Sequence, residues 1–247
     1  MKKEALLSLI KDLVAVPSIT ESACESVPAE MIYERLSALP YFQESPRNLR
    51  LIDTPLEGSV NSLRSVMARV DATKKTDRTL LLIGHFDVVD VSCYGDFADS
   101  AFDCDKLGEI FGADPDTLYG RGTMDMKCGD AIETLLIEEF ANDRTLFDVN
   151  LVMALVGDEE NSSAGMRGVL PILAEMQGEG LDFLAALNTE PGEAGLSGAS
   201  GPMVFLGTLG KLMPSFYVRG CDAHVGNAYN GFSAILKASH LVTYADG

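Results

Sequence analysis

The stretch LVMALVGDEEN, residues 151–161, runs six apolar residues into a glycine and three consecutive acids. A short apolar run bounded by a glycine is typical of a strand that is buried on both faces of a sheet. The acids that follow repel one another and are poorly solvated at the end of such a strand. We therefore expect a cation or open water beside them.

Other apolar runs along the chain predict further strands. With the opening stretch included, strands are expected at residues 63–70, 79–89, 148–157, 181–190 and 203–210. Helical periodicity predicts helices that end before Pro17, that cover about 28–39, 125–142 and 164–177, and that follow residue 230; Pro171 should kink or shorten the fourth. Strands alternating with helices indicate an α/β fold, with a mixed, largely parallel sheet covered by helices. Residues 92–118 lack periodicity and are predicted to be a long loop at the rim of a site.

The composition excludes several classes of partner. The 247 residues include 19 Lys and Arg against 37 Asp and Glu, a formal net charge of −18. Such a chain repels phosphate backbones and anionic membrane surfaces, so neither nucleic acid nor a membrane is an expected partner. Apolar runs stay well below the roughly 18 residues that a membrane-spanning helix needs. Five cysteines without a CxxC pair indicate reduced thiols, and we expect a cytoplasmic protein.

Polar clusters follow the predicted strands, and each has a simple interpretation when taken alone. His85 and Asp87 are two residues apart, on one side of an extended segment, so the carboxylate can orient a metal-binding imidazole. The simpler alternative is a hydrogen-bonded pair in a loop. Asp125, at the start of a predicted helix, is a metal ligand or a helix N-cap.

The remaining acids come directly after two other strands. Glu159 and Glu160 either lie in a solvated loop or have separate roles. In the second case one acid binds metal and the other faces the reacting water. Glu190 is either a ligand or an ordinary strand exit. Because the ends of successive strands gather at one edge of an α/β sheet, His85, Asp125, Glu160 and Glu190 can converge. Such a set suits two divalent ions; zinc is the first choice, with manganese or cobalt conceivable.

Four motifs, GHFDVV, GRGTMDMK, GDEE and NTEP, occur in this order within about residues 80–191. Their combination resembles the signature of the co-catalytic di-zinc peptidases and deacylases, which include aminoacylase, glutamate carboxypeptidase and succinyl-diaminopimelate desuccinylase. The long acidic segment at residues 92–118, between the first two motifs, is similar to the bacterial arginine-utilisation branch of that family. The resemblance implies a zinc exopeptidase-like catalytic domain.

The resemblance also assigns roles to the residues of the motifs. His85 is implied as a ligand of one zinc, Asp87 as its orienting acid and Asp125 as the bridge between both ions. Glu159 corresponds to the general base, and the other two acids complete the implied ligand set: Glu160 and Glu190. A non-proline cis peptide is implied directly after Asp125.

The segment VRGCDAHVGNAYNGFSA resembles the start of the family's small α+β lid, or dimerisation, domain. There a histidine, matched by His224, supports the developing oxyanion, often in the partner subunit of a homodimer. Ala228 stands where the family usually has proline, so a plain surface histidine is the alternative. The expected division is a catalytic domain at 1–213 and the beginning of the lid at 214–247. We expect a fragment, because the family's last histidine ligand has no match.

The resemblance implies a metal-dependent hydrolase that cleaves a peptide or N-acyl-amino-acid amide bond in amino-acid or peptide catabolism. Two alternatives remain open at this point. A histidine with several carboxylates also suits a phosphoesterase, and a chain that lacks one ligand also suits a metal-binding module without catalysis.

Overall fold

The computed structural model describes residues 2–56, 62–112, 114, 116–191, 204, 206–207 and 215–245. The chain divides into two compact units, Met1–Glu193 and Ala194–Gly247. The first unit contains a sheet and its helices. The second contains, over its described residues, the helical turn η4 (Val225–Asn230) and α7 (Ala234–Ala245), the helix expected after residue 230. The expected domain boundary at 213/214 lies outside the described residues.

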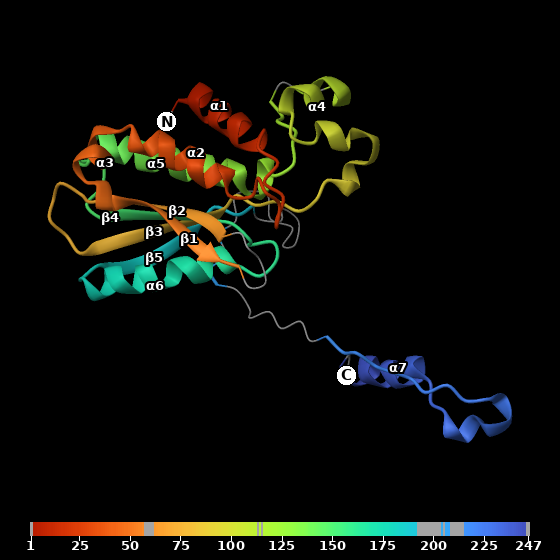
Figure 1. Ribbon diagram of the computed structural model, residues 1–247. Coiled ribbons are helices and arrows are strands. Elements are labelled where there is room, and N and C mark those ends of the chain that lie inside the picture. Colours follow the sequence, from red (N-terminus) through yellow and green to blue (C-terminus); the bar gives the residue numbers. More distant parts are fainter. Residues whose placement is uncertain are drawn as a thin grey trace. The chain divides into compact units, whose positions relative to one another are not determined.

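Within the described residues of the first unit, five strands form one mixed sheet (Figure 1). In spatial order they are β1 (Leu49–Pro55), β2 (Ser62–Val70), β4 (Asn150–Val156), β3 (Arg78–His85) and β5 (Asp182–Asn188). β3 is parallel to β4 and β5, whereas β2 is antiparallel to β1 and β4. The carboxyl ends of β3, β4 and β5 therefore lie at one edge of the sheet, where α/β folds place their sites.

β4 lies in the middle of the sheet, and every one of its residues is buried. Its side chains alternate between two cores: Leu151 and Met153 pack in one, Val152 and Ala154 in the other. A strand that is covered on both faces has to be apolar at successive positions. The opening stretch of sequence therefore predicts the central strand correctly.

Within the first unit, helices cover both faces of the sheet, with α6 on one side and α1, α2, α3 and α5 opposite (Figure 1). The first face is covered by α1 (Lys3–Val14), α2 (Val27–Ser37), α3 (Pro40–Glu44) and α5 (Cys128–Asn142). Leu13, Ile32 and Phe140 from these helices are fully buried against the sheet. α6 (Ala164–Gly178) packs on the second face through Val169 and Leu173. The helices predicted from periodicity are thus present, close to their expected bounds.

The prediction that residues 92–118 form a long loop is wrong. This segment contains η2 (Ser92–Ser100), a 3-10 segment, and α4 (Cys104–Phe111). At the start of α4, the carboxylate of Asp103 accepts the N–H of Lys106 at 3.0 Å, and Gly112 ends the helix in the left-handed region with φ 64°. The eight residues of α4 span about two turns, which is too short for a clear apolar period.

Other strand and helix predictions also need correction. The strand expected at 79–89 ends at His85, and β1, preceded by the short turn η1 (Pro46–Asn48), was not predicted. β1 is an edge strand with exposed Asp53 and Pro55, so it lacks a continuous apolar run. α6 continues past Pro171 to Gly178, because its buried side chains hold both halves of the helix on the sheet. The strand expected at 203–210 lies mostly outside the described residues.

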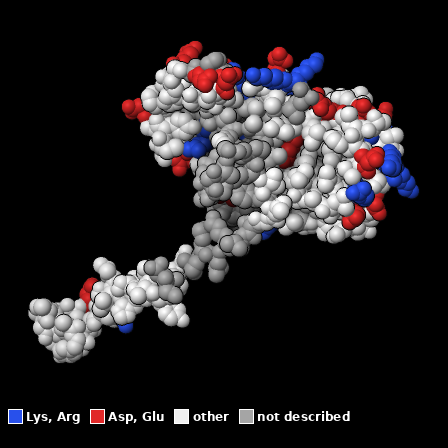
Figure 2. Space-filling view, turned by 180° about the vertical axis from the view of Figure 1, so that it is seen from behind, with Lys and Arg blue, Asp and Glu red and all other residues white. Residues whose placement is uncertain are grey.

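Charged groups are distributed unevenly over the two units (Figure 2). Acidic and basic side chains are scattered over the face of the first unit that Figure 2 shows. Between residues 215 and 245 the second unit carries Lys, Arg, Asp or Glu at three positions, Arg219, Asp222 and Lys237. Over all the described residues, the helices are too short or too polar to cross a membrane.

Candidate metal centre

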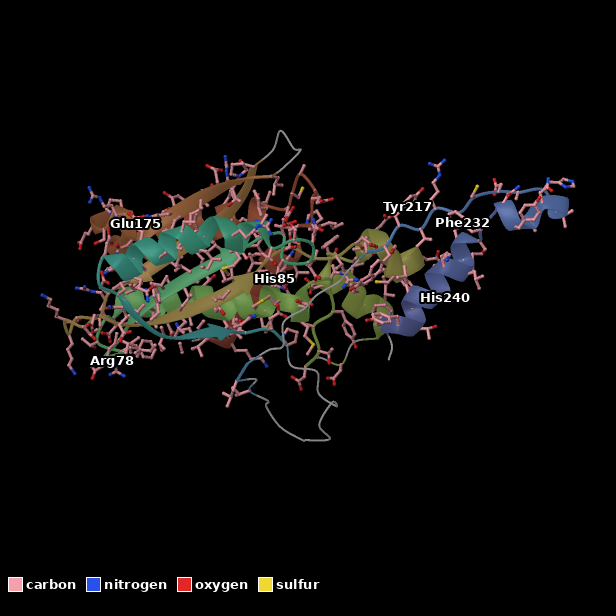
Figure 3. All side chains as sticks on the ribbon, turned by 90° about the horizontal axis from the view of Figure 1, so that it is seen from below. Arg78, His85, Glu175, Tyr217, Phe232 and His240 are labelled. Carbon is pink, nitrogen blue, oxygen red and sulfur yellow. The ribbon has the colours of Figure 1, made fainter. Side chains whose placement is uncertain are left out.

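His85 ends β3 at the carboxyl edge of the sheet, and Arg78 begins the strand at the opposite edge (Figure 3). The Nε2 atom of His85 lies 3.0 Å from Asp125 Oδ1, 3.2 Å from Glu190 Oε1 and 3.9 Å from Glu159 Oε2. These acids come from three separate segments of the chain. Of the four residues predicted to converge, the structure therefore brings His85, Asp125 and Glu190 together, with Glu159 beside them.

The donor atoms of His85, Asp125 and Glu190 all lie within 4.8 Å of one another. An imidazole nitrogen with carboxylate oxygens is a donor set that zinc uses in catalytic sites, and manganese accepts similar oxygen donors. The ring of His85 is buried, whereas the Asp125 and Glu190 side chains are 53% and 35% exposed. The group thus fits a divalent ion that the buried ring of His85 binds on the protein side and that solvent reaches past the partly exposed carboxylates.

The electrostatics of the group favour a cation. Burial lowers the pKa of His85, but hydrogen bonds to Asp125 and Asp87 outweigh burial and raise the pKa to about 11. The bond to His85 in turn lowers the pKa of Asp125. Burial raises the pKa of Glu190, against the effect of the charge on His85. Without metal, the proton on His85 supplies the positive charge that these carboxylates require.

Asp87 is fully buried and connects His85 with the segment after β4. His85 Nδ1 lies 3.1 Å from the carbonyl oxygen of Asp87 and 3.4 Å from its Oδ1. The two carboxylate oxygens also accept the backbone N–H groups of Glu159 at 3.1 Å and Glu160 at 3.2 Å. One buried acid therefore orients the imidazole and fixes the backbone of both glutamates, as a partner of a metal ligand commonly does.

Glu159 and Glu160 occupy different places around the site. The Glu159 side chain is 48% exposed, and its carboxylate is near His85 at the distance given above. Glu160 lies outside the group of three donors, and burial followed by the negative charge of Asp125 raises its pKa. The carboxylate of Glu160 is thus close enough to Asp125 to interact with it electrostatically.

Asp158, for which the sequence suggested no role, organises the turn that carries these glutamates. It is 3% exposed and adopts a left-handed backbone conformation with φ 62°. Its carboxylate accepts the Ser162 hydroxyl at 2.6 Å, the Ala164 N–H at 2.9 Å and the Asn161 amide at 3.2 Å. Burial raises its pKa, but these bonds outweigh burial and lower it. Since Ala164 begins α6, Asp158 fixes the path from β4 into that helix; a polar residue shortly before a helix is the signal that indicates this role.

Asp125 lies in η3 (Thr123–Lys127), an irregular turn before α5. Asp125 and Met126 have non-helical backbone angles, and the peptide bond between them is cis, as the resemblance implies. Because α5 begins only after this turn, Asp125 is not its N-cap.

Lys127 anchors the same turn against α1 and was not singled out from the sequence. Its ammonium group is fully buried and donates to the carbonyl oxygens of Leu13 at 3.0 Å and Val16 at 2.8 Å. Burial lowers its pKa to about 8, although the nearby charges of Asp130 and Asp87 oppose this change. The two hydrogen bonds hold the backbone that presents Asp125.

His224 belongs to the second unit, where it is exposed. Its Nδ1 atom accepts the backbone N–H of Gly226 at 3.1 Å, which caps η4. The role in catalysis that the resemblance implies for His224 stays a prediction.

A sequence model of one protein family, described as Peptidase family M20/M25/M40, matches residues 81–241. This range contains all the candidate site residues. Among solved structures, an M20 family metallo-carboxypeptidase, Sso-CP2 from Sulfolobus solfataricus, has a similar fold, with a TM-score of 0.51 and 19% identity. The similarity covers 78% of this chain and 38% of that one.

Three relatives illustrate the similarity in sequence. The uncharacterized protein YqjN of Bacillus subtilis is 34% identical over 97% of this chain and 45% of its own length. Protein RocB of the same organism is 26% identical over 97% of this chain and 44% of its own length. The succinyl-diaminopimelate desuccinylase of Verminephrobacter eiseniae is 27% identical over 89% of this chain and 51% of its own length. The chain thus spans about half the length of these relatives.

Proposed function

Because the chain belongs to peptidase family M20/M25/M40, we propose that it is the metal-binding part of a hydrolase that cleaves a peptide or N-acyl-amino-acid amide bond. The observation that carries this proposal is the convergence of His85, Asp125 and Glu190 at the carboxyl edge of the sheet. The names of the relatives support both kinds of bond, since they include a desuccinylase and a metallo-carboxypeptidase.

His85, Asp125 and Glu190 would hold one divalent ion, and Glu160 together with Asp125 would help to hold a second. Zinc is the first choice for both, with manganese or cobalt as alternatives for this mixed nitrogen and oxygen donor set. When bound, such ions lower the pKa of a water molecule to about 7 and polarise the amide carbonyl group. Asp87 keeps Nε2 of His85 directed toward Asp125, so the ring is oriented before an ion arrives.

Glu159 is the proposed general base. Its half-exposed carboxylate lies 3.9 Å from His85 Nε2, so it faces the centre and can still contact a water molecule. In this role Glu159 takes a proton from the attacking water and returns it to the leaving amine. The hydrogen bond from its backbone N–H to Asp87 restricts where the carboxylate can lie.

Three further proposals concern the setting of this chemistry. His224 donates to the developing oxyanion, and the second unit takes part in a homodimer, which together would complete the site. The acidic segment at residues 92–118 supports membership of the arginine-utilisation branch, with a role in amino-acid catabolism. The five cysteines are free thiols, which supports a cytoplasmic location.

The test of this function compares Glu159→Gln with Glu160→Gln. Each protein is purified in a full-length form and loaded with zinc, its metal content is measured, and hydrolysis is assayed on acyl-amino acids, dipeptides and phosphoesters. Glu159→Gln should keep the metal content of the wild type but lose about 10²- to 10⁴-fold in kcat, because general-base catalysis contributes about that factor. Glu160→Gln should lose bound metal instead.

Two results would count against the proposal. Undiminished amide hydrolysis by Glu159→Gln would remove Glu159 from the role of general base. A wild-type protein with full metal content that cleaves phosphoesters but not amides, or cleaves nothing, would remove the proposed bond class.

A further inference from the structure

The segment after α1 lies alongside the chain that leaves β3. Ser18 donates its hydroxyl to the carbonyl oxygen of Phe86 at 2.6 Å, and its own carbonyl oxygen accepts the N–H of Val88 at 3.0 Å. Thr20 then donates its N–H to the carbonyl oxygen of Val88 at 3.1 Å. These bonds form a short parallel pairing, which brings the side chain of Thr20 next to Asp87, between Phe86 and Val88.

The hydroxyl of Thr20 donates to Asp87 Oδ2 at 3.0 Å. The carbonyl oxygen of Val88 is a second acceptor, at 3.3 Å. The hydroxyl has one hydrogen, and an ionised carboxylate is the stronger acceptor, so the shorter bond to Asp87 dominates. Since Asp87 is fully buried, water cannot replace this donor if the hydroxyl is removed.

The carboxylate of Asp87 therefore has donors on both oxygens. Oδ1 accepts the N–H of Glu159 and lies near the His85 ring, whereas Oδ2 accepts the N–H of Glu160 together with the hydroxyl of Thr20. Without that hydroxyl, Oδ2 would keep the Glu160 N–H as its partner, at 3.2 Å. The carboxylate would then be held less firmly in the geometry that serves both His85 and the glutamates, because only the two backbone donors would remain beside the His85 ring.

The same segment also contacts the turn after β4 directly. Glu21 Oε1 accepts the side-chain amide of Asn161 at 3.2 Å, and that amide also bonds Asp158. Glu21 itself has a left-handed backbone conformation with φ 64°, stabilised by a 2.6 Å bond from its N–H to Glu25. Residues 18–25 thus contact two of the chain segments around the metal centre, the one that leaves β3 and the turn after β4.

We propose that Thr20 is a positioning residue for the metal centre, acting through Asp87 on the ring of His85 and on the backbone of Glu159 and Glu160. The inference rests on the proposed function for its effect on metal binding. Its effect on the backbone of the two glutamates is independent of any metal.

The test uses three variants of the whole chain. Thr20→Val removes the hydroxyl and keeps the side-chain shape, and Thr20→Ser restores the hydroxyl. Thr145→Val is the matched control, because the exposed Thr145 also donates its hydroxyl to a carboxylate, that of Asp143 at 2.6 Å, but belongs to a loop outside the site. Urea denaturation of each variant identifies any general loss of stability.

The first measurement is hydrogen exchange of the Glu159 and Glu160 amides in metal-free protein, followed by NMR. Thr20→Val should raise these exchange rates about tenfold relative to the wild type, after correction for global stability, because a charged acceptor loses one of its donors. Thr20→Ser and Thr145→Val should stay within about twofold of the wild type. Unchanged rates in Thr20→Val, or equal increases in Thr20→Ser or Thr145→Val, would overturn the inference.

The second measurement is the affinity for Co²⁺, followed by its visible absorption. Thr20→Val should raise the Kd about tenfold, the lower end of the range for loss of a group that supports metal ligands, and Thr20→Ser should restore it. A Kd for Thr20→Val within twofold of the wild type would overturn the effect on metal binding. If the wild type bound no Co²⁺ while the exchange rates changed as expected, the proposed function would fail and the positioning role of Thr20 would stand.

Discussion

Metal-free protein should keep His85 protonated far above the pH at which a histidine normally loses its proton. An unperturbed histidine has a pKa of about 6.5, so only about 1% of it is protonated at pH 8.5. Burial lowers the pKa of His85, but the bonds to Asp125 and Asp87 raise it to about 11. At pH 8.5 and without metal, nearly every molecule should therefore carry an imidazolium at this position.

The sign of the effect on stability follows from the direction of this shift. Because the pKa of His85 is higher in the folded than in the unfolded protein, its contribution is fully present below about pH 6.5. That contribution is lost as the pH rises toward about 11. Asp125→Asn removes a negative partner of the ring, so the pKa of His85 should fall by about 1–3 units. The variant should then lose less of its free energy of unfolding as the pH rises.

The assay is an NMR titration of the histidine ring nitrogens, carried from about pH 5 to about pH 12 so that it spans both the ordinary pKa of histidine and the raised pKa of His85. The chain has three histidines, so His224 and His240 give internal comparisons in the same spectra. Addition of zinc at pH 7.5 should convert His85 to the neutral, metal-bound ring and release its proton, because a ligating imidazole must be neutral.

Two results would refute this reasoning. A midpoint near pH 6.5 for His85 in the metal-free wild type would show that Asp125 and Asp87 do not hold its proton. An unchanged midpoint in Asp125→Asn would show that the 3.0 Å contact between His85 and Asp125 is absent in solution.

Three further predictions concern the surroundings of the site. Asp158→Ala should lower the free energy of unfolding by about 2–4 kcal/mol in urea denaturation, because a buried carboxylate and its hydrogen bonds are lost. The lowered pKa of Asp158 means that the wild type should lose this stabilisation on acidification, and an equally acid-sensitive variant would contradict the assignment. Gly168→Ala should destabilise by about 1–3 kcal/mol, because a Cβ atom there would collide with Thr54, whereas Gly178→Ala meets open space and should not destabilise. Free zinc at a hundredfold its Kd should stabilise the wild type by about 2.7 kcal/mol, and Glu190→Gln should lose most of this gain at the same zinc concentration.

The parts of the fold that the sequence predicts are those in which burial determines residue type. β4 is covered on both faces, so only apolar residues are tolerated along it. α1 ends before Pro17 because the proline ring clashes with the preceding helical turn. β1 is half-exposed at the sheet edge and mixes Arg50 and Asp53 with apolar residues, so its strand pattern is weak. Within residues 92–118, α4 is too short for periodicity to predict it, and the signals that mark it are the residues at its ends, Asp103 and Gly112.

The candidate site is predictable where its residues follow strands directly. His85 ends the mostly buried strand β3 and Glu190 comes just after β5, so their convergence follows from the parallel pairing of these two strands in the sheet. The position of Asp158 shortly before α6 indicates a helix-starting role, but its positive φ and the particular bonds that it accepts are not apparent from the sequence. Thr20 is still less apparent, because its contact with Asp87 joins residues 67 positions apart in the chain.

The most direct test of the metal centre is anomalous diffraction at the zinc absorption edge, from crystals of the protein grown with zinc. The structure predicts a peak at about 2.0–2.2 Å from His85 Nε2 and from one oxygen each of Asp125 and Glu190. A zinc peak bound by other residues, or no peak between these three in zinc-saturated protein, would contradict the account.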